Sequence, residues 1–323
     1  MRRWLNMITA GQSVRRIAVD AGLHAAAGFV DFLPRMKQRM AATRLIEDLV
    51  YARHGGTKLG LDILQPKGPG PHPVLMYLHG GAFAVGSKRT HRALAAAYAS
   101  QGYLVCNVDY RLAPQYPFPA AIQDACAAWL WVTDHAGNYG GDRNRIALAG
   151  ESAGANLALS VLLACCTPRP ESFAAPLFRH GVRPAVALLY CGFLQTSAPK
   201  RYQRAGVSAL AARIAIDAAR SYLGRSAEHP GQEHALADPL CIVEAMHAPS
   251  RLPPLFIAAG LNDPVAADSQ RLERELMRLE SPCSAHYYAG EPHAFHVMFW
   301  RENAIRCWRD SFEFLHRHLP VNA

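Results

Sequence analysis

The chain has 323 residues, of which half are hydrophobic and 18% are charged. This balance is typical of a globular protein with a substantial core and excludes a disordered chain. The formal net charge is +9 at pH 7, but the basic residues are scattered and form no long Lys/Arg run, zinc-finger spacing or RNA-binding signature. We therefore expect solvated basic surfaces and no nucleic-acid partner.

The eight cysteines form no C-x-x-C pair, and most stand inside apolar runs. This pattern indicates buried free thiols in a reducing compartment rather than a disulfide framework. The basic N-terminus has only a short, interrupted apolar stretch and makes a poor secretory signal. The run 17–33 contains Asp20, His24 and Asp31 and is too polar to span a bilayer. These features predict a cytoplasmic protein.

In chain order, the first fifty or so residues look helical and amphipathic, with no strand signal until about Thr57. From there, short apolar runs alternate with helical stretches, which predicts a mostly parallel sheet covered by helices on both faces. The predicted strands are Leu59–Leu64, Val74–Leu78, Tyr103–Val108, Ile146–Ala149, Ala185–Tyr190, Leu255–Ala259 and Ala285–Tyr288. The predicted helices are His91–Gln101, Ala120–His135, Ala153–Cys165, Pro264–Glu280 and about Ile305–His318.

The segment between Gly192 and about Pro253 breaks this alternation. It holds a helix near Ser208–Leu223 and a polar stretch punctuated by Gly and Pro, with no convincing strand. We interpret it as an insertion that caps the core. The predicted limits are 51–192 and 253–323 for the α/β core, 193–252 for the cap insertion and 1–50 for an N-terminal helical cap segment.

The sharpest local motif is Gly150–Gly154, which reads G-E-S-A-G and lies between an apolar strand and a helical run. A G-x-S-x-G motif in that setting is typical of a nucleophile elbow, whose glycines avoid collisions at a strained turn. Ser152 is therefore the predicted nucleophile. The competing interpretation is an ordinary glycine-rich turn between strand and helix.

An activated serine needs donors for the oxyanion that forms when it attacks a carbonyl. The segment Tyr77–Phe83 reads Y-L-H-G-G-A-F and directly follows a predicted strand. The backbone N–H groups of Gly80 and Gly81 can approach a substrate because no Cβ intervenes, and Ala153 follows the nucleophile. These three residues are the predicted oxyanion hole. A simple glycine turn after a strand is the alternative.

A base and an acid complete the predicted site. His293 lies in the loop G-E-P-H-A-F after a predicted strand, which is the usual place for such a base, and His296 is its nearest competitor. Asp263 follows another predicted strand, where it could instead cap the next helix. The chain order Ser152, Asp263, His293 is the order that an α/β-hydrolase triad requires, and Asp238 and Asp268 are less well placed.

With these residues in view, the chain resembles the hormone-sensitive-lipase family of esterases (family IV) within the α/β-hydrolase superfamily. The resemblance runs from about Val74 to His318 and rests on several short motifs. They are HGGAF at 79–83, DYRLAP at 109–114, FPAAIQD at 118–124, GESAG at 150–154, DP at 263–264 and HAF at 293–295. The resemblance implies an α/β-hydrolase fold with an eight-stranded sheet and a helical cap. It also implies hydrolysis of short- to medium-chain acyl esters without a cofactor or metal.

Two positions depart from the family pattern. Ala82 replaces the third glycine of the usual HGGG segment, which keeps the backbone N–H but leaves the loop less free, and Gln115 stands where the family often has glutamate. By the same resemblance, Asp109, Arg111 and Asp124 have structural roles. We interpret Glu151, the variable residue of the elbow, as a structural residue that reaches solvent or a second layer around the site.

Three alternatives stay open. A non-catalytic ligand receptor on the same fold, as plant gibberellin receptors are, is disfavoured because such receptors lack the histidine found here at 293. A related acyl bond, such as an amide, carbamate or lactone, is compatible with the same triad. The N-terminal segment, with apolar and arginine residues interleaved, could bind a membrane surface, although a cap helix is the favoured interpretation. The expected partner is a small acyl ester, and a homodimer is left open.

Overall fold

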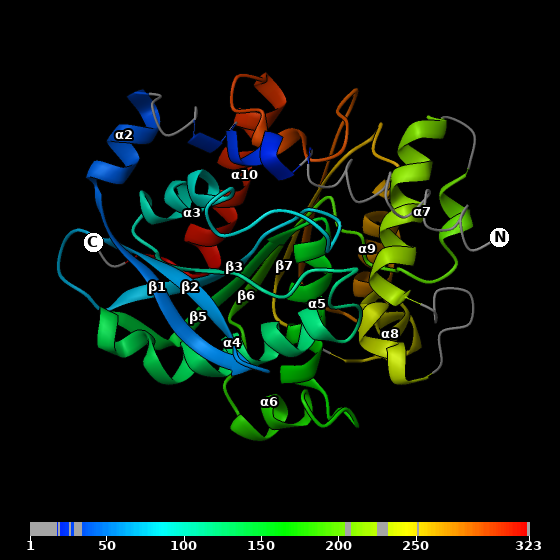
Figure 1. Ribbon diagram of the computed structural model, residues 1–323, viewed down its shortest axis with the longest axis horizontal. Coiled ribbons are helices and arrows are strands. Elements are labelled where there is room, and N and C mark those ends of the chain that lie inside the picture. The colour runs from blue at the N-terminus through cyan, green and yellow to red at the C-terminus, as the bar shows by residue number, and fades with distance from the viewer. Residues whose placement is uncertain are drawn as a thin grey trace.

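The computed structural model describes residues 18, 20–25, 27–28, 34–203, 208–224, 232–250 and 252–321. Within them, eight strands form one sheet in the order β1-β2-β4-β3-β5-β6-β7-β8 (Figure 1). The strands are β1 (Thr43–His54), β2 (Thr57–Pro66), β3 (His72–Leu78), β4 (Leu104–Val108), β5 (Gly141–Glu151), β6 (Val186–Tyr190), β7 (Leu255–Gly260) and β8 (Cys283–Tyr288). β2 pairs antiparallel with β1 and β4, and every other pair is parallel. The predicted mostly parallel, eight-stranded sheet is confirmed.

The edge strand β1 was not expected. The prediction of no strand before about Thr57 is wrong, because β1 begins at Thr43. Its register with β2 shifts twice, and Asp48 at the first shift adopts a left-handed φ of 58°. Bulges of this kind break the two-residue alternation by which a half-buried strand is recognised in a sequence.

Helices cover both faces of the sheet (Figure 1). One face packs against α3 (Arg92–Ala99) and α10 (Glu302–His318), and the other packs against α4 (Ala120–His135), α5 (Ala153–Cys166) and α9 (Ala266–Arg278). The buried side chains form two hydrophobic clusters, a smaller one on the side of α3 and α10 and a larger one on the side of α4, α5 and α9. Successive residues of β3 point to opposite faces, so Tyr77 packs in the smaller cluster and Leu78 in the larger one. Because both faces are covered, the central strands are mainly apolar where they are buried.

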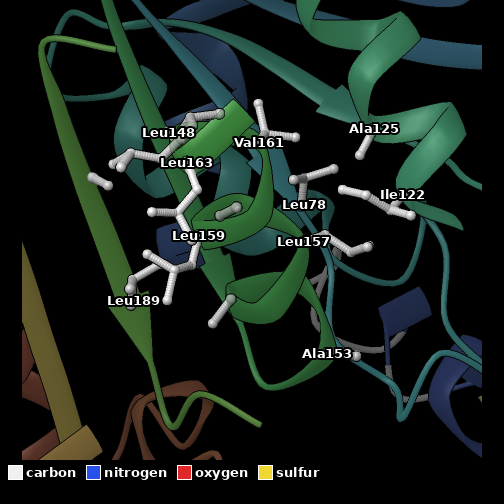
Figure 2. Close-up of a cluster of buried hydrophobic side chains, with 14 of the residues drawn as sticks. Leu78, Ile122, Ala125, Leu148, Ala153, Leu157, Leu159, Val161, Leu163 and Leu189 are labelled. Carbon is white, nitrogen blue, oxygen red and sulfur yellow. The ribbon is translucent and has the colours of Figure 1, made fainter. Parts of the chain in front are cut away.

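The helix α5 lies at the centre of the larger cluster (Figure 2). Nearly all of its residues are buried, because the sheet lies on one side and other helices lie around it. Figure 2 labels Leu157, Leu159, Val161 and Leu163 of α5 beside side chains from the sheet and α4. Burying one such side chain contributes about 1.5–3 kcal/mol, so the position of α5 is strongly fixed. Its first residue follows Ser152 directly.

The predicted cap insertion is helical where the structure describes it. It contains η2 (Pro199–Tyr202), α7 (Ala209–Leu223), η4 (Gln232–Ala237) and α8 (Pro239–Ala245), and the described parts of 193–252 hold no strand. The predicted helix near Ser208–Leu223 is confirmed as α7, where the Ser208 Oγ accepts a hydrogen bond from the Ala211 N–H. A short helix α6 (Ala175–His180), which was not predicted, follows α5.

Hydrogen bonds tie this insertion to α5. The Asn156 side-chain amide donates to the carbonyls of Phe193, at 2.9 Å, and Ala237, at 3.0 Å. One turn further along, the Ser160 hydroxyl donates to the Leu236 carbonyl. All of these groups are buried, where a lost partner is expensive, so the insertion is fixed in place against the helix that follows Ser152.

About half of the predicted N-terminal cap segment, 1–50, lies outside the described residues. Its described parts include α2 (Pro34–Ala41), whose Met36 packs into the smaller cluster. The Asp20 carboxylate accepts a hydrogen bond from the Gly86 N–H at 3.0 Å. Among the helices that the structure describes, none combines the length and apolar character needed to cross a membrane.

Candidate active site

Ser152 sits at a strained turn between β5 and α5. Its φ of 53° and ψ of −114° are unfavourable for a residue with a Cβ, so the surrounding structure has to hold the turn in place. The two motif glycines make the turn possible. A Cβ on Gly150 would lie 2.3 Å from the Gly154 carbonyl oxygen, and one on Gly154 would lie 2.0 Å from that of Leu78. Neither position can hold any other residue without moving backbone.

The structure brings Ser152, His293 and Asp263 into one hydrogen-bonded chain. The His293 Nε2 lies 2.9 Å from the Ser152 Oγ, and its Nδ1 lies 2.8 Å from the Asp263 Oδ2. The other Asp263 oxygen accepts a hydrogen bond from the Val265 N–H. With Nδ1 donating to the carboxylate, Nε2 is left to accept the serine proton.

These three residues come from the carboxyl ends of different strands. Ser152 follows β5, Asp263 follows β7, and His293 stands in the loop after β8. Because these strands are parallel, their carboxyl ends meet at the same edge of the sheet. In open α/β sheets, ligands bind at this edge.

The competing candidates lie elsewhere. His296 is buried with its Nε2 beside the Glu151 carboxylate, and it has no contact with Ser152. Asp268 accepts hydrogen bonds from Arg201, Tyr202 and backbone N–H groups of the insertion, and the Asp238 carboxylate likewise accepts from backbone at the start of the insertion. Both aspartates anchor the insertion.

The charge environment favours a protonatable His293. Burial alone would lower the pKa of His293, but the Asp263 carboxylate, which is also its hydrogen-bond acceptor, raises the pKa above its ordinary value, and Glu151 adds to the effect. Asp263 itself is fully buried, with its two oxygens occupied by His293 and Val265. The site therefore stabilises an imidazolium at His293, which is the form that a general base acquires when it takes a proton.

Backbone donors lie at the same edge. Gly80 and Gly81 directly follow β3, and Ala153 is the first residue of α5, where a helix leaves its N–H groups without an intrahelical partner. In the part of the chain that the structure describes, no protein acceptor pairs with these three N–H groups. Their hydrogen-bonding capacity is therefore unused within the described residues.

The loop that carries Gly80 and Gly81 is tightly folded. Gly81 has φ +110°, and a Cβ there would lie 2.0 Å from the Val85 carbonyl oxygen. The following Ala82 and Phe83 both have left-handed φ values, of 56° and 58°. For residues with a Cβ this conformation costs roughly 1–2 kcal/mol each, so the loop is held in an unfavourable shape by its surroundings. Ala82 thus occupies the family's third glycine position at the cost of strain.

Hydrogen bonds and ring stacking hold the loop that carries Gly80 and Gly81. The buried His79 ring stacks on Tyr110 at 4.2 Å, and its Nδ1 lies 2.7 Å from the Gly80 carbonyl oxygen. The Tyr110 hydroxyl donates to the His79 carbonyl. Burial, together with the charge of His91, lowers the pKa of His79 to about 3, so this ring is neutral at working pH.

One residue differs from its expected environment. Glu151 does not reach solvent: it is 3% exposed, with its carboxylate oxygens 2.7 Å from the His91 Nε2 and 2.6 Å from the His296 Nε2. Neither His91 nor its contact with Glu151 was foreseen. The two residues are 60 positions apart, and only the neighbouring ends of β3 and β5 bring their segments together.

A metal site at this position is a chemical alternative. The ligand atoms of Cys191, Asp263 and His293 lie within 4.8 Å of one another. However, burial raises the pKa of the Cys191 thiol well above its ordinary value, whereas a metal ligand has to be a thiolate. The facing atoms of Asp263 and His293 are also already hydrogen-bonded to each other. The chemistry of these groups suits proton transfer better than metal binding.

Comparison with known proteins gives the family. A family model described as the α/β-hydrolase fold matches residues 75–297. The chain is 31% identical over 282 residues to the esterase LipI of Mycobacterium tuberculosis, which covers 84% of this chain and 80% of that protein. The chain therefore belongs to the α/β-hydrolase family.

Other α/β-hydrolases resemble it as well. An acetyl-hydrolase of Streptomyces hygroscopicus is 32% identical over 243 residues, covering 74% of this chain and 73% of the relative. The structure of a bacterial heroin esterase superposes with a TM-score of 0.76 at 24% identity, covering 94% of this chain and 90% of that one. Membership in the α/β-hydrolase family confirms the resemblance that the motifs suggested.

Proposed function

We propose that this α/β-hydrolase cleaves short- to medium-chain carboxylic esters through an acyl-enzyme intermediate on Ser152. The observation that carries the proposal is the hydrogen-bonded chain of Ser152, His293 and Asp263, with N–O separations of 2.8 and 2.9 Å. The relatives named as esterases and as an acetyl-hydrolase support the same bond type. The substrate is a small acyl ester, and the reaction needs no cofactor.

His293 takes the serine proton as the Ser152 Oγ attacks the acyl carbon. Asp263 holds the imidazole in the required tautomer and stabilises the imidazolium that forms. The negative charge on the acyl oxygen is bound by the N–H groups of Gly80, Gly81 and Ala153. His293 then gives its proton to the departing alkoxide, and water hydrolyses the acyl-enzyme by the same route.

The segment 193–252 acts as the substrate-facing cap, and residues 51–192 and 253–323 form most of the catalytic core, which also includes the start of β1. The anchoring of the insertion on α5 supports this division, because it fixes the insertion against the helix that directly follows the nucleophile. The N-terminal segment 1–50 contributes a further cap element rather than a membrane anchor. The Asp20 contact with Gly86, next to the oxyanion loop, supports this role. We place the enzyme in the cytoplasm and leave a homodimer open.

Hydrolysis of p-nitrophenyl esters tests the proposal. We expect turnover of the acetate and butyrate esters by the wild-type chain and none above background by Ser152→Ala. Serine-independent turnover, or none at all, would remove the proposal and favour a receptor on the same fold. Equal rates on an ester and its matched amide would instead assign the enzyme to amide hydrolysis, because the triad itself serves both bonds.

A further inference from the structure

Glu151 directly precedes the nucleophile, yet its side chain joins two other segments of the site. The His91 Nε2 lies 2.7 Å from one carboxylate oxygen, and the His296 Nε2 lies 2.6 Å from the other. His91 immediately precedes α3, and His296 lies in η5 (Phe295–Val297), three residues after His293. One buried carboxylate therefore contacts two segments, the residue that precedes α3 and the turn that follows His293.

The same side chain supports the oxyanion loop. A Cβ on Gly80 would lie 2.9 Å from the Glu151 Cγ, so the backbone of Gly80 is packed directly on it. A Cβ on Gly86, at the end of the loop, would lie 3.2 Å from the His91 ring and 3.1 Å from the Gly80 carbonyl oxygen. The side chains of Glu151 and His91 thus pack against the oxyanion loop and support it.

Hydrogen bonding shows which partner carries the positive charge. The His91 Nδ1 lies 2.8 Å from the Thr90 hydroxyl oxygen and 3.2 Å from the Ser87 carbonyl oxygen. With the Thr90 hydroxyl donating to the Ser87 carbonyl, the His91 Nδ1 is a donor; burial alone would lower the pKa of His91, but the Glu151 carboxylate raises it above the ordinary value, which favours this arrangement. Its Nε2 faces the carboxylate and also donates. An imidazole with two donors is an imidazolium, so Glu151 and His91 form a buried ion pair.

His296 contributes a close polar contact to the same carboxylate, with its Nε2 2.6 Å from the second oxygen but outside hydrogen-bonding geometry. Its Nδ1 has no partner among the described residues, and its ring stacks on Tyr190 with centroids 4.8 Å apart. The carboxylate thus faces the imidazole rings of both His91 and His296.

The remaining groups around the carboxylate are uncharged. Burial, with smaller contributions from Glu151, raises the pKa values of the tyrosines and the cysteine nearby, and burial lowers that of His79 to about 3. These neighbours are Tyr77, Tyr110, Tyr190, Cys191 and His79. Burial alone would also raise the pKa of Glu151, but its interactions with His91 and His296 hold it well below the usual value. The negative charge next to Ser152 is therefore permanent at working pH.

We propose that Glu151 is a positioning residue for ester hydrolysis, whose buried carboxylate holds the oxyanion loop and the His293 loop around Ser152 and whose charge stabilises the imidazolium of His293. This inference rests on the proposed function and adds a second carboxylate to the site. Asp263 acts on His293 by direct contact, whereas Glu151 acts through space and through the segments that it joins.

The test compares Glu151→Gln with wild type across pH. Glutamine keeps the size of the side chain and removes its charge. We expect kcat for p-nitrophenyl acetate to fall about tenfold or more with little change in KM, because the groups that stabilise the transition state lose their alignment. We also expect the acidic limb of the pH profile to move to lower pH, because His293 loses a stabilising negative charge. A purely structural role would lower the rate without moving the limb.

Two further variants separate charge from packing. Glu151→Asp keeps the charge and should leave the acidic limb at the wild-type position while recovering part of the rate. His91→Gln also keeps the carboxylate, so its limb should not move to lower pH. The matched control is Asp62→Asn, which removes another buried carboxylate, one that pairs with Lys88 and Arg92 rather than with His91 or His296. It should lower stability and leave the limb unchanged.

A second readout makes the test independent of the ester chosen. The rate at which a fluorophosphonate labels Ser152 reports activation of the serine by His293, and it is measured over the same pH range for each variant. If wild type is labelled but hydrolyses no ester, the proposed function fails. The acidic limb of the pH profile of the labelling rate still tests the role of Glu151. If Glu151→Gln matches wild type within about twofold in labelling rate and in the pH of its limb, the role of Glu151 is overturned. If Glu151→Gln does not fold, the other two variants decide. An acidic limb at lower pH than wild type in His91→Gln or in Glu151→Asp, both of which keep the carboxylate, would overturn the role of Glu151.

Discussion

Replacing Gly154 with alanine provides a sharp test of the elbow, because two physical effects predict opposite results. In a helix, alanine is favoured over glycine by about 1 kcal/mol, so propensity alone predicts a more stable protein. The packing predicts the reverse. The new Cβ would lie 2.0 Å from the Leu78 carbonyl oxygen and 2.5 Å from that of His79, whereas non-bonded contacts settle near about 3.5 Å.

The overlap has no easy relief. Both obstructing atoms belong to backbone, so no rotamer change can remove them, and Leu78 is a fully buried residue of the central sheet. Forced packing in a rigid core costs about 1–3 kcal/mol and sometimes more, which exceeds the gain in propensity. We expect Gly154→Ala to lower the free energy of unfolding by about 2 kcal/mol or more. A backbone shift of about 1 Å at this position should also reduce kcat about 100-fold.

Urea unfolding and hydrolysis of p-nitrophenyl butyrate measure both effects. Gly137→Ala is the matched control, because a Cβ there meets nothing within 4 Å and its backbone conformation suits alanine. It should change stability by no more than about 0.5 kcal/mol and leave the rate unchanged. If Gly154→Ala were as stable as wild type and hydrolysed the ester at a similar rate, the account of the elbow given above would be refuted.

Three further predictions concern the rest of the site. Asp263→Asn should keep its fold but lose about 10⁴-fold in kcat, because an amide favours the wrong tautomer of the base; steady-state kinetics would contradict this if the rate stayed within tenfold of wild type. Because the neutral form of His293 is the active base and its pKa is raised, kcat/KM should fall as the pH drops through a value above about 6.5, and a midpoint below about 6 would be inconsistent with the site described. Asn156→Leu should destabilise the chain by about 1–3 kcal/mol in urea, since two buried carbonyls lose their donor, and an unchanged unfolding midpoint would argue against anchoring of the insertion.

The fold could be predicted from the sequence because its core is regular. Seven strands were recognised as apolar runs, and the helices between them were found with limits close to those observed. The observed β5 is longer than expected, since it begins at Gly141 rather than Ile146, and its residues 142–145 are not buried. The edge strand β1 was missed because its bulges and its polar residues hide the alternation.

The site was predictable to the extent that its chemistry follows strand ends. Ser152, Asp263 and His293 each come shortly after a parallel strand, so topology alone brings them to one edge. The environment of Glu151 was not predictable in this way. Its partners depend on how the loop before α3 and the turn η5 fold over the sheet, and a histidine in a polar stretch such as S-K-R-T-H carries no local signal of burial.

The hydrogen bonds from Asn156 and Ser160 fix the insertion to α5, the same helix that directly follows the Ser152 turn. Under the proposed function, a change in the insertion away from these anchors reshapes the space offered to an acyl chain while the triad keeps its alignment. Under that proposal, diversification of substrate range, whether by natural drift or by laboratory selection, should accumulate in α7. The two anchoring turns of α5 should tolerate almost no variation.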